Sequence, residues 1–170
     1  MTGPQPTACD IHPGYRPGLI GRITEMHASY YARAAGFGLP FELVVSSGLT
    51  EFAGRLDRPM NALWSAVAGD RVLGSIAIDG EDLGGGLAHL RWFIVDDALR
   101  GSGAGKRLLR AALDFVDARG FQACHLWTFS GLAAARHLYE TQGFALAEER
   151  PGRQWGSEVL EQRFVRSTPR

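Results

Sequence analysis

Cysteine is scarce in this sequence, and the two that occur, Cys9 and Cys124, lie far apart without CxxC or CxxH spacing. Two such residues are too few for a disulfide framework or a zinc site, and they suit a reducing compartment. No run approaches the roughly 18 apolar residues of a membrane span. The N-terminus reads MTGPQPTACD, without the basic and apolar regions of a leader. We therefore expect a cytoplasmic protein that requires no metal and has no membrane partner.

An excess of charge of either sign is also absent. Lys plus Arg and Asp plus Glu both number 18, so the formal net charge is zero at pH 7. This balance disfavours a nucleic acid as the main partner, and any basic site must be local. Repeats and low-complexity linkers are missing too, while 170 residues with 45% hydrophobic residues can form one real core. The prediction is a single domain over residues 1–170.

Apolar residues recur at three- and four-residue spacing in several stretches, which is typical of helices with one buried face. After residue 105 this stripe is followed by Gly120, where a left-handed cap belongs. Ser130 is the expected N-cap of a short final helix that Gly143 stops. The predicted helices span residues 19–31, 40–55, 105–120 and 133–142.

Runs rich in β-formers lie between these helices. The predicted strands span residues 62–68, 72–78, 87–95, 124–129, 145–149 and 158–165. The first two are separated by Gly69-Asp70 and predict a hairpin. The strand 87–95 ends in four apolar residues, so we expect that end to be buried on both faces. Strands and helices alternate in the middle and hairpins lie at both ends, which predicts an α/β (α+β) fold with a mixed sheet and helices on both faces.

The densest chemical signal is the loop RGSGAG at residues 100–105, between a strand and a helix. Glycines at alternate positions let a ligand approach the backbone closely. The helix start offers unpaired N–H groups and a positive dipole end, which suit a phosphate or pyrophosphate. A phosphate-rich ligand is predicted, and the alternatives are a turn without ligand or a solvated basic face. The cationic residues around the loop are Arg100, Lys106, Arg107 and Arg110.

Spacing separates the ligand classes that use such loops. The P-loop pattern GxxxxGK[ST] would place its first glycine on Arg100 and its Ser or Thr on Arg107. The dinucleotide pattern GxGxxG meets Lys106 where its third glycine belongs, and this loop follows a mid-chain strand of a hairpin-rich sheet. Neither Walker-type hydrolysis nor dinucleotide binding is therefore expected.

Two motifs resemble the GNAT superfamily of N-acetyltransferases. The segment RGSGAG at 100–105 is similar to its (Q/R)-x-x-G-x-(G/A) signature, and ARHLYETQGF at 135–144 is similar to its A-x-x-L-Y-x-x-x-G-F segment. LRWFIVDD, LWTFSGLAAARHLYE and EERPGRQWG resemble the acetyltransferase half of bacterial MarR-GNAT fusion proteins, here without a winged-helix portion. The resemblance covers nearly the whole chain and implies a GNAT fold, with a mostly antiparallel sheet splayed between two central strands.

The same resemblance implies acetyl-CoA as cosubstrate and assigns its contacts. Its pantetheine arm would pair with the backbone of Phe93, Ile94 and Val95 in the manner of an added strand. Leu132 stands where the family often has an asparagine, and Arg136 or the helix backbone could compensate. The side chains of Phe93 and Val95 also read as core. The residues implied to hold the pyrophosphate are Arg100, Gly101, Ser102, Gly103, Ala104, Gly105 and Lys106.

Acetyl transfer to an amine needs a neutral nucleophile, a stabilised oxyanion and a proton for the departing thiolate. Tyr139 stands where many GNAT enzymes carry a tyrosine that protonates the coenzyme A sulfur. A phenol is a candidate for this role because its reference pKa of about 10 is above that of a thiol. A packing role on its helix is the alternative. His89 lies eleven positions before Arg100, where some GNAT enzymes carry a catalytic glutamate. A histidine can accept an amine proton, and the alternatives are an exposed strand residue or a water relay.

The implied activity is direct transfer of an acetyl group, in a ternary complex, to a primary amine on a small molecule or a peptide. His27 and Glu51 are expected on the acceptor side or in core and surface roles, and Trp127 and Phe129 on the other wall of the splayed gap or in packing. The rival functions are a non-catalytic acyl-CoA-binding module and a regulatory, partner-binding domain. A homodimer is a further expectation, because many proteins of this fold form one.

Overall fold

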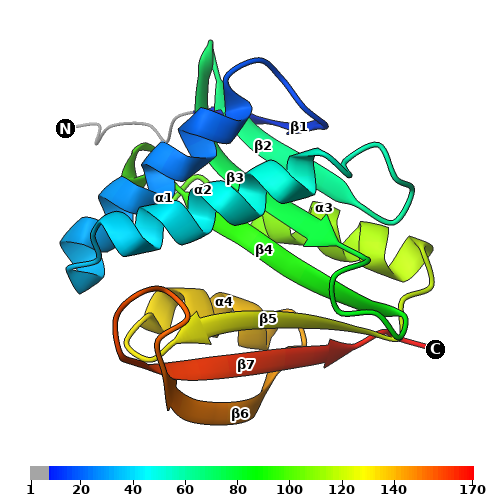
Figure 1. Ribbon diagram of the computed structural model, residues 1–170. Helices are drawn as coiled ribbons and strands as arrows, with labels where there is room; N and C mark the ends of the chain where they lie inside the picture. The colour runs from blue at the N-terminus through cyan, green and yellow to red at the C-terminus, as the bar shows by residue number, and fades with distance from the viewer. Residues whose placement is uncertain (1–7) are drawn as a thin grey trace, which may run out of the picture.

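The computed structural model describes residues 8–170 and is built around a seven-stranded sheet (Figure 1). Residues 1–7, in which the sequence predicts no leader, lie outside the described part. The strands are β1 (Asp10–Pro13), β2 (Ala62–Ala68), β3 (Arg71–Asp79), β4 (Leu87–Val95), β5 (Ala123–Phe129), β6 (Ala145–Gly152) and β7 (Val159–Ser167). The helices are α1 (Leu19–Ala35), α2 (Leu39–Ala53), α3 (Ala104–Ala118) and α4 (Ala133–Thr141), with a 3₁₀ turn at Asp97–Leu99.

The strands follow the order β1-β2-β3-β4-β5-β7-β6, and neighbours run antiparallel except for β4 and β5. α1 and α2 cover the front of the sheet in Figure 1, and α3 and α4 lie behind it. The predicted mixed, mostly antiparallel sheet with helices on both faces is confirmed. Within residues 8–170 no helix combines the length and apolar character that a membrane crossing requires.

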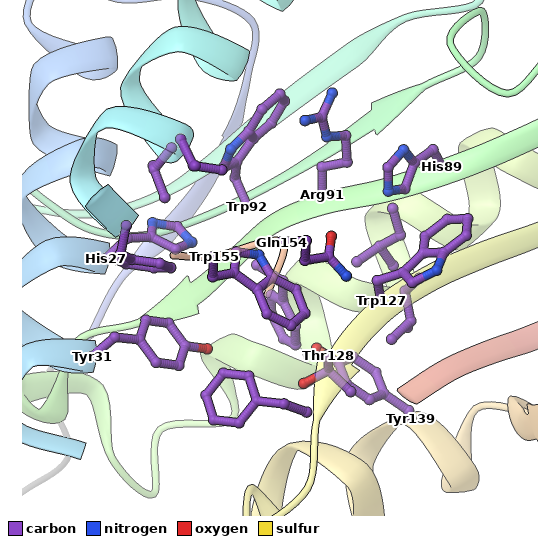
Figure 2. Close-up of a pocket in the computed structure, with 17 residues that line it drawn as sticks. His27, Tyr31, His89, Arg91, Trp92, Trp127, Thr128, Tyr139, Gln154 and Trp155 are labelled. Carbon is purple, nitrogen blue, oxygen red and sulfur yellow. The ribbon is translucent and has the colours of Figure 1, made fainter. Parts of the chain in front are cut away.

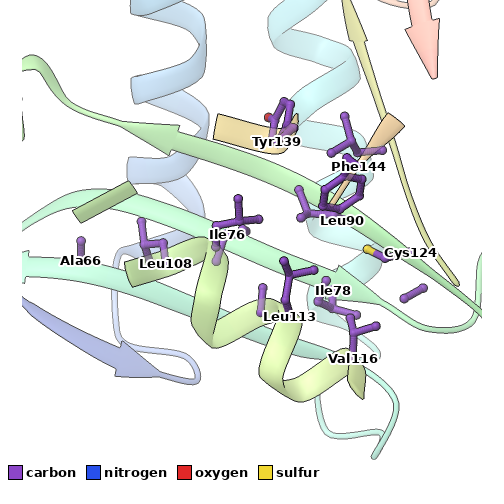
Figure 3. Close-up of a cluster of buried hydrophobic side chains, with 14 of the residues drawn as sticks. Ala66, Ile76, Ile78, Leu90, Leu108, Leu113, Val116, Cys124, Tyr139 and Phe144 are labelled. Atoms are coloured by element: carbon purple, nitrogen blue, oxygen red, sulfur yellow. The ribbon is translucent and has the colours of Figure 1, made fainter. Parts of the chain in front are cut away.

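The main hydrophobic core lies between α3 and the sheet (Figure 3). The helical stripe expected after residue 105 is fully buried there and consists of Leu108, Leu109, Ala112, Leu113 and Val116. A second core packs α1 and α2 against the opposite face through Leu19, Ile23, Leu49 and Phe52. Two apolar faces of one sheet are therefore covered by separate helix pairs, which fixes the sheet as the rigid centre of the molecule.

Local signals predicted most element ends to within two residues, but α1 and β6 run four and three residues further than expected, and two other features differ. β1 was not expected, because four residues ending in Pro13 carry too little alternation to be recognised, yet they pair with β2 at the sheet edge. Ser130 as N-cap is wrong: α4 begins after Leu132 without a side-chain cap, and the Ser130 N–H instead donates to the Leu160 carbonyl at 2.9 Å. The left-handed glycine at position 120 is confirmed, with φ 75°.

β4 and β5 pair only briefly. Their parallel register covers three positions, the last of which joins His89 to His125, and the two strands then diverge. A bulge in β4 lies in the diverging part, because Trp92 and Phe93 together face the single residue Ile76 of β3. Trp92 has φ 47°, a left-handed conformation that is costly for a bulky residue. The result is a sheet that is continuous at one end and open at the other.

The expectation that the end of β4 is buried on both faces is wrong. Of its last four residues only Ile94 is buried, and Trp92, Phe93 and Val95 are partly exposed. The physical reason is the missing neighbour, since β5 has already turned away from this part of β4. Apolar side chains and strand backbone are thereby left facing open space.

A buried carboxylate fixes the turn after β3. Asp79 is fully buried, and its two oxygens accept from the Arg55 guanidinium at 2.7 and 3.1 Å. It also accepts from the backbone N–H groups of Glu81 and Asp82. Burial works to raise the pKa of Asp79, but Arg55 and the two amides outweigh it and hold the pKa below its usual value. This anchoring sets the position of Asp82 beside β4.

Candidate active site

Two cavities open where β4 and β5 diverge. The large groove, of about 580 Å³, runs from the end of β4 to the starts of α3 and α4. The small pocket, of about 170 Å³, lies between β4, β5, the two front helices and the loop after β6 (Figure 2). Both are lined by Tyr31, Phe93, Thr128 and Tyr139. The four shared residues mark the place where contents of the two cavities can meet.

The glycine loop forms the phosphate-sized end of the large groove. Gly101 and Gly103 have φ 75° and 78°, and a Cβ on either would meet nothing within 4 Å. Across the described chain, the backbone N–H groups of Gly101, Gly103, Gly105 and Lys106 find no protein acceptor. Free N–H groups, open space and a helix N-terminus together form a site that suits an anion.

Two residues of the loop serve its shape. The Ser102 hydroxyl donates to the Leu99 carbonyl at 2.6 Å and accepts from the Ala104 N–H at 3.2 Å. Ala104 is almost completely buried under the loop. The Ser102 N–H also donates to the Leu99 carbonyl at 3.0 Å. The amides of Ser102 and Ala104 are thus already engaged, which leaves those of Gly101, Gly103 and Gly105 free for a ligand.

Most of the residues expected to bind the cofactor line the large groove, and three do not. The groove is lined by Phe93, Ile94, Val95, Arg100, Gly101, Gly103, Ala104 and Gly105. Ser102, Lys106 and Arg136 lie outside its walls. Arg136 is drawn away because it pairs with Glu140 at 2.9 Å and packs over the ring of Phe164. Leu132, which replaces the family asparagine, is part of the wall.

The neighbouring cations differ in availability. The Arg100 side chain is 82% exposed, with one hydrogen bond of 2.9 Å to Asp97, so it can swing over the groove. Arg107 donates to the Cys9 carbonyl at 2.9 Å and thereby ties α3 to the start of β1. Of these two arginines, Arg100 is therefore available to a ligand in the groove, whereas Arg107 has a structural role.

Tyr139 lies at the junction of the two cavities. Its side chain is 6% exposed and packs between Phe93, Phe144 and Phe164 at ring-centroid distances of 5.9 to 6.2 Å. Burial, with a smaller contribution from Tyr31, raises the pKa of Tyr139 well above that of a free phenol. Tyr139 therefore packs on its neighbours, as the alternative expected, and also lines both cavities, and its hydroxyl keeps its proton at neutral pH.

His89 lines the small pocket and has a carboxylate partner. Its Nδ1 lies 2.6 Å from Oδ2 of Asp82, and its ring meets Trp127 edge to face at 4.9 Å. In the neutral ring, a proton on Nδ1 that is donated to Asp82 leaves Nε2 as an acceptor. Asp82 was not expected at the site, because it lies seven residues away across a turn that only the fold closes.

The remaining walls of the small pocket come from the helices and the loop after β6. His27 is buried on α1, and its Nδ1 donates to the Ile23 carbonyl at 2.8 Å. Burial lowers the pKa of His27 to about 4, which the backbone hydrogen bond only partly offsets, so its ring is neutral and Nε2 is an acceptor. Glu51 is not part of the pocket and instead binds Arg55 at 2.6 Å. Of the two acceptor-side candidates, the structure therefore brings only His27 to the site.

Three further residues of the small pocket, Tyr31, Thr128 and Trp155, were not predicted from the sequence. Tyr31 points its hydroxyl across the pocket toward Thr128 and Tyr139 (Figure 2), and burial raises the pKa of Tyr31 to about 12. Trp155 comes from the loop after β6 and packs on Phe129 at 5.6 Å. Tyr31 belongs to a helical stripe and Thr128 to a β-rich run, so neither carries a local signal that separates it from core residues.

The residues that the structure describes contain no evident metal-binding site. From residue 8 onward, no group of three or more His, Cys, Asp or Glu side chains is placed to hold an ion. The cysteines also lie apart from the site, since Cys9 and Cys124 line neither cavity. Burial raises the pKa of the Cys124 thiol to about 12, so it carries no thiolate at neutral pH.

Residues 22–144 match the family model described as the acetyltransferase (GNAT) family. The chain belongs to the GNAT acetyltransferase family. This membership confirms the resemblance carried by the two sequence motifs, and the GNAT fold explains the splayed sheet. The likeness to MarR-GNAT fusion proteins stays a prediction.

Solved GNAT structures share this fold at low sequence identity, while no curated protein matches the chain. A GNAT-family acetyltransferase from Staphylococcus aureus Mu50 is 16% identical at TM-score 0.77, covering 95% of this chain and 100% of that one. A proposed acetyltransferase from Salmonella typhimurium, solved with its cofactor acetyl-CoA, is 17% identical at TM-score 0.76, covering 96% and 95%. The ribosomal-protein-S18-alanine N-acetyltransferase from Escherichia coli is 18% identical at TM-score 0.67, covering 96% of both.

The neutral, buried His27 of this GNAT chain should make its stability depend on pH. Its folded pKa of about 4 lies below the unfolded value of about 6.5, so the unfolded state binds an extra proton between these values. The free energy of unfolding should therefore fall as pH drops, by roughly 2 kcal/mol from pH 7 to 4.5 on account of this residue. Urea unfolding at both pH values measures the loss, and His27→Met should be less pH-dependent by about that amount.

His12→Asn provides the matched control, since His12 is an exposed histidine of β1. It should keep the pH dependence of the unsubstituted chain. An unchanged dependence in His27→Met would show that the imidazole is charged in the folded state, contrary to its burial.

Proposed function

We propose that this chain is an acetyl-CoA-dependent N-acetyltransferase that transfers the acetyl group to a primary amine by direct transfer in a ternary complex. The observation that carries the proposal is the junction of the two cavities at Tyr31, Phe93, Thr128 and Tyr139. A donor in one cavity and an acceptor in the other can be bound together and react where they meet. Neither cysteine lines a cavity, so the arrangement favours direct transfer over a thiol-bound acetyl group.

The large groove fits acetyl-CoA. The free amides of Gly101, Gly103 and Gly105, which line the groove, suit the pyrophosphate, and Arg100 can close over it. The open edge of β4 around Phe93 to Val95 suits the peptide-like pantetheine arm, which would add to it as a strand. When bound, acetyl-CoA supplies an activated acetyl thioester with a thiolate as leaving group.

The small pocket binds the acceptor amine. His89 Nε2 accepts the proton that the attacking amine loses, and Asp82 holds the imidazole in the tautomer that can do so. Tyr139 supplies a proton from its hydroxyl at the junction, on the side of the departing sulfur. Because burial raises the pKa of Tyr139, its hydroxyl carries a proton at neutral pH, and the proton taken up by His89 balances the one that Tyr139 gives to the thiolate.

The groove assignment is tested with a pair of glycine substitutions. Gly103→Ala and Gly84→Ala both place a methyl group at a left-handed position, φ 78° and 66°, with nothing within 4 Å. Each should destabilise the fold by a similar amount, about 1 kcal/mol. Only Gly103→Ala should also weaken acetyl-CoA binding in calorimetry, at least tenfold, because Gly103 lines the groove and Gly84 does not. Equal affinities in the two variants would rule out the glycine loop as the binding site.

Tyr139→Phe should separate the acid from the binding site. The substitution removes one hydroxyl and keeps the ring packing, so acetyl-CoA affinity should stay within about twofold. General acid catalysis is typically worth 10²–10⁴-fold, and we expect kcat for amine-dependent CoA release to fall about 100-fold. Tyr15→Phe, at an exposed tyrosine, controls for loss of a phenol elsewhere and should be unchanged. An unaltered kcat in Tyr139→Phe contradicts the acid role.

The base is tested through its partner. His89→Gln should lower kcat about 100-fold. Asp82→Ala should lower kcat about tenfold with little change in the KM for acetyl-CoA, whereas Asp82→Asn, which still accepts the Nδ1 proton, should recover most of the rate. If His89→Gln, Asp82→Ala and Asp82→Asn all kept the kcat of the unsubstituted chain, His89 would not be the base. Acetyl-CoA binding without CoA release for any amine would instead indicate a non-catalytic binding module.

A further inference from the structure

The small pocket is sized for one ring. Its volume is about 170 Å³, well under the roughly 300–1,000 Å³ typical of sites for drug-sized ligands. An apolar cavity of about 150 Å³ is known to hold a benzene molecule. A single six-membered ring with a short arm therefore fills the space between β4, β5 and the front helices.

Aromatic side chains make up about half of the pocket lining. They are Tyr31, Phe41, Trp92, Phe93, Trp127, Phe129, Tyr139 and Trp155. Such walls bury an aromatic ligand in offset or edge-to-face contact, which is worth about 0.5–1.5 kcal/mol for each ring pair beyond burial alone. The polar side chains of the lining are His27, whose ring is neutral, His89, Arg91, Thr128 and Gln154.

The pocket is close to neutral. Among its described lining residues Arg91 alone carries a permanent charge, and no carboxylate is exposed in the wall. Arg91 stacks on Trp92 at 4.0 Å, and the carboxylates of Asp79 and Asp82 lie 3.6 Å from its guanidinium. These two carboxylates thus offset the positive charge of Arg91. A ligand carboxylate would have to compete with Asp79 and Asp82 for the Arg91 guanidinium, and a second ammonium would lie beside its positive charge.

The wall formed by the loop after β6 is already in place. Gln154 is held through its backbone N–H and its side-chain amide by the two oxygens of Glu161, at 2.9 and 3.0 Å. Gly156 packs against Pro40 so closely that no Cβ would fit. Trp155, between these anchors, is therefore fixed against Phe129 before any ligand arrives. A preformed wall sets an upper limit to the size of the acceptor near the reacting amine.

We infer that the acceptor is a compact primary amine on a single aromatic ring, with no carboxylate or second charge on its frame. The inference rests on the proposed N-acetyltransferase function and deepens it. The ring would lie among the tryptophans of the small pocket, with its amine near His89 and the junction. Amino acids, polyamines and peptide chains, which bring further charges or bulk, fit this pocket poorly.

The test compares matched acceptors with the full-length chain and acetyl-CoA, using CoA release as readout. Benzylamine supplies the ring and the amine. Phenylglycine adds only a carboxylate on the carbon that bears the amine, and a short peptide with a free N-terminus and a lysine adds bulk. We expect kcat/KM for benzylamine to exceed that of either comparator at least 100-fold.

A variant then tests the pocket itself. Trp155→Leu should lower the ratio of kcat/KM for benzylamine to that for propylamine at least fivefold, since the ratio is insensitive to a general loss of activity. Trp64→Leu is the control: Trp64 packs on Phe115 of α3 and does not line the pocket, so the ratio should be unchanged.

The outcomes separate this inference from the function on which it rests. Phenylglycine or the peptide as the best acceptor, or an unchanged ratio in Trp155→Leu, overturns the acceptor class and leaves the acetyltransferase proposal standing. Acetyl-CoA binding with no CoA release for any amine overturns both.

Discussion

The divergence of β4 from β5 after His89 is the feature on which the site depends. The bulge lies in the diverging part, where one extra residue bends β4 and increases its twist. There Trp92 occupies a left-handed conformation, φ 47°, and its carbonyl accepts a 2.7 Å hydrogen bond from the buried Ser75 hydroxyl of β3. Both cavities open where the two strands diverge. A β4 that was paired with β5 along its whole length would leave no free strand edge between them.

Charges outside the cavities hold the geometry of the proposed site. The buried pair of Arg55 and Asp79 joins the end of α2 to the turn after β3, and the same turn presents Asp82 to His89 at 2.6 Å. A buried ion pair adds little net stability compared with apolar packing, but it penalises every arrangement that breaks it. Its contribution here is to specify one position of the turn, and therefore one orientation of the His89 ring.

Most of the architecture could be predicted from local pattern. The helical stripe of α3, the hairpin of β2 and β3 and the glycine caps each follow from spacing that a few neighbouring residues define. The pattern failed where a neighbour was missing or distant. The end of β4 has the composition of a strand buried on both faces, but its exposure depends on β5, about thirty residues away. Ser130 has the chemistry of an N-cap, yet a hydrogen bond to Leu160 of β7 holds it elsewhere.

The sequence identified the family and the glycine loop, because the residue types of two short motifs can be recognised without the fold. The family resemblance also pointed to Tyr139, on a helix, and to His89, on a strand. The fold was needed to show which cations lie at the groove, that Asp82 stands behind His89, and that Tyr31 and Trp155 close the small pocket. These relations join residues that are distant in the chain, and packing across the sheet, rather than local spacing, sets them.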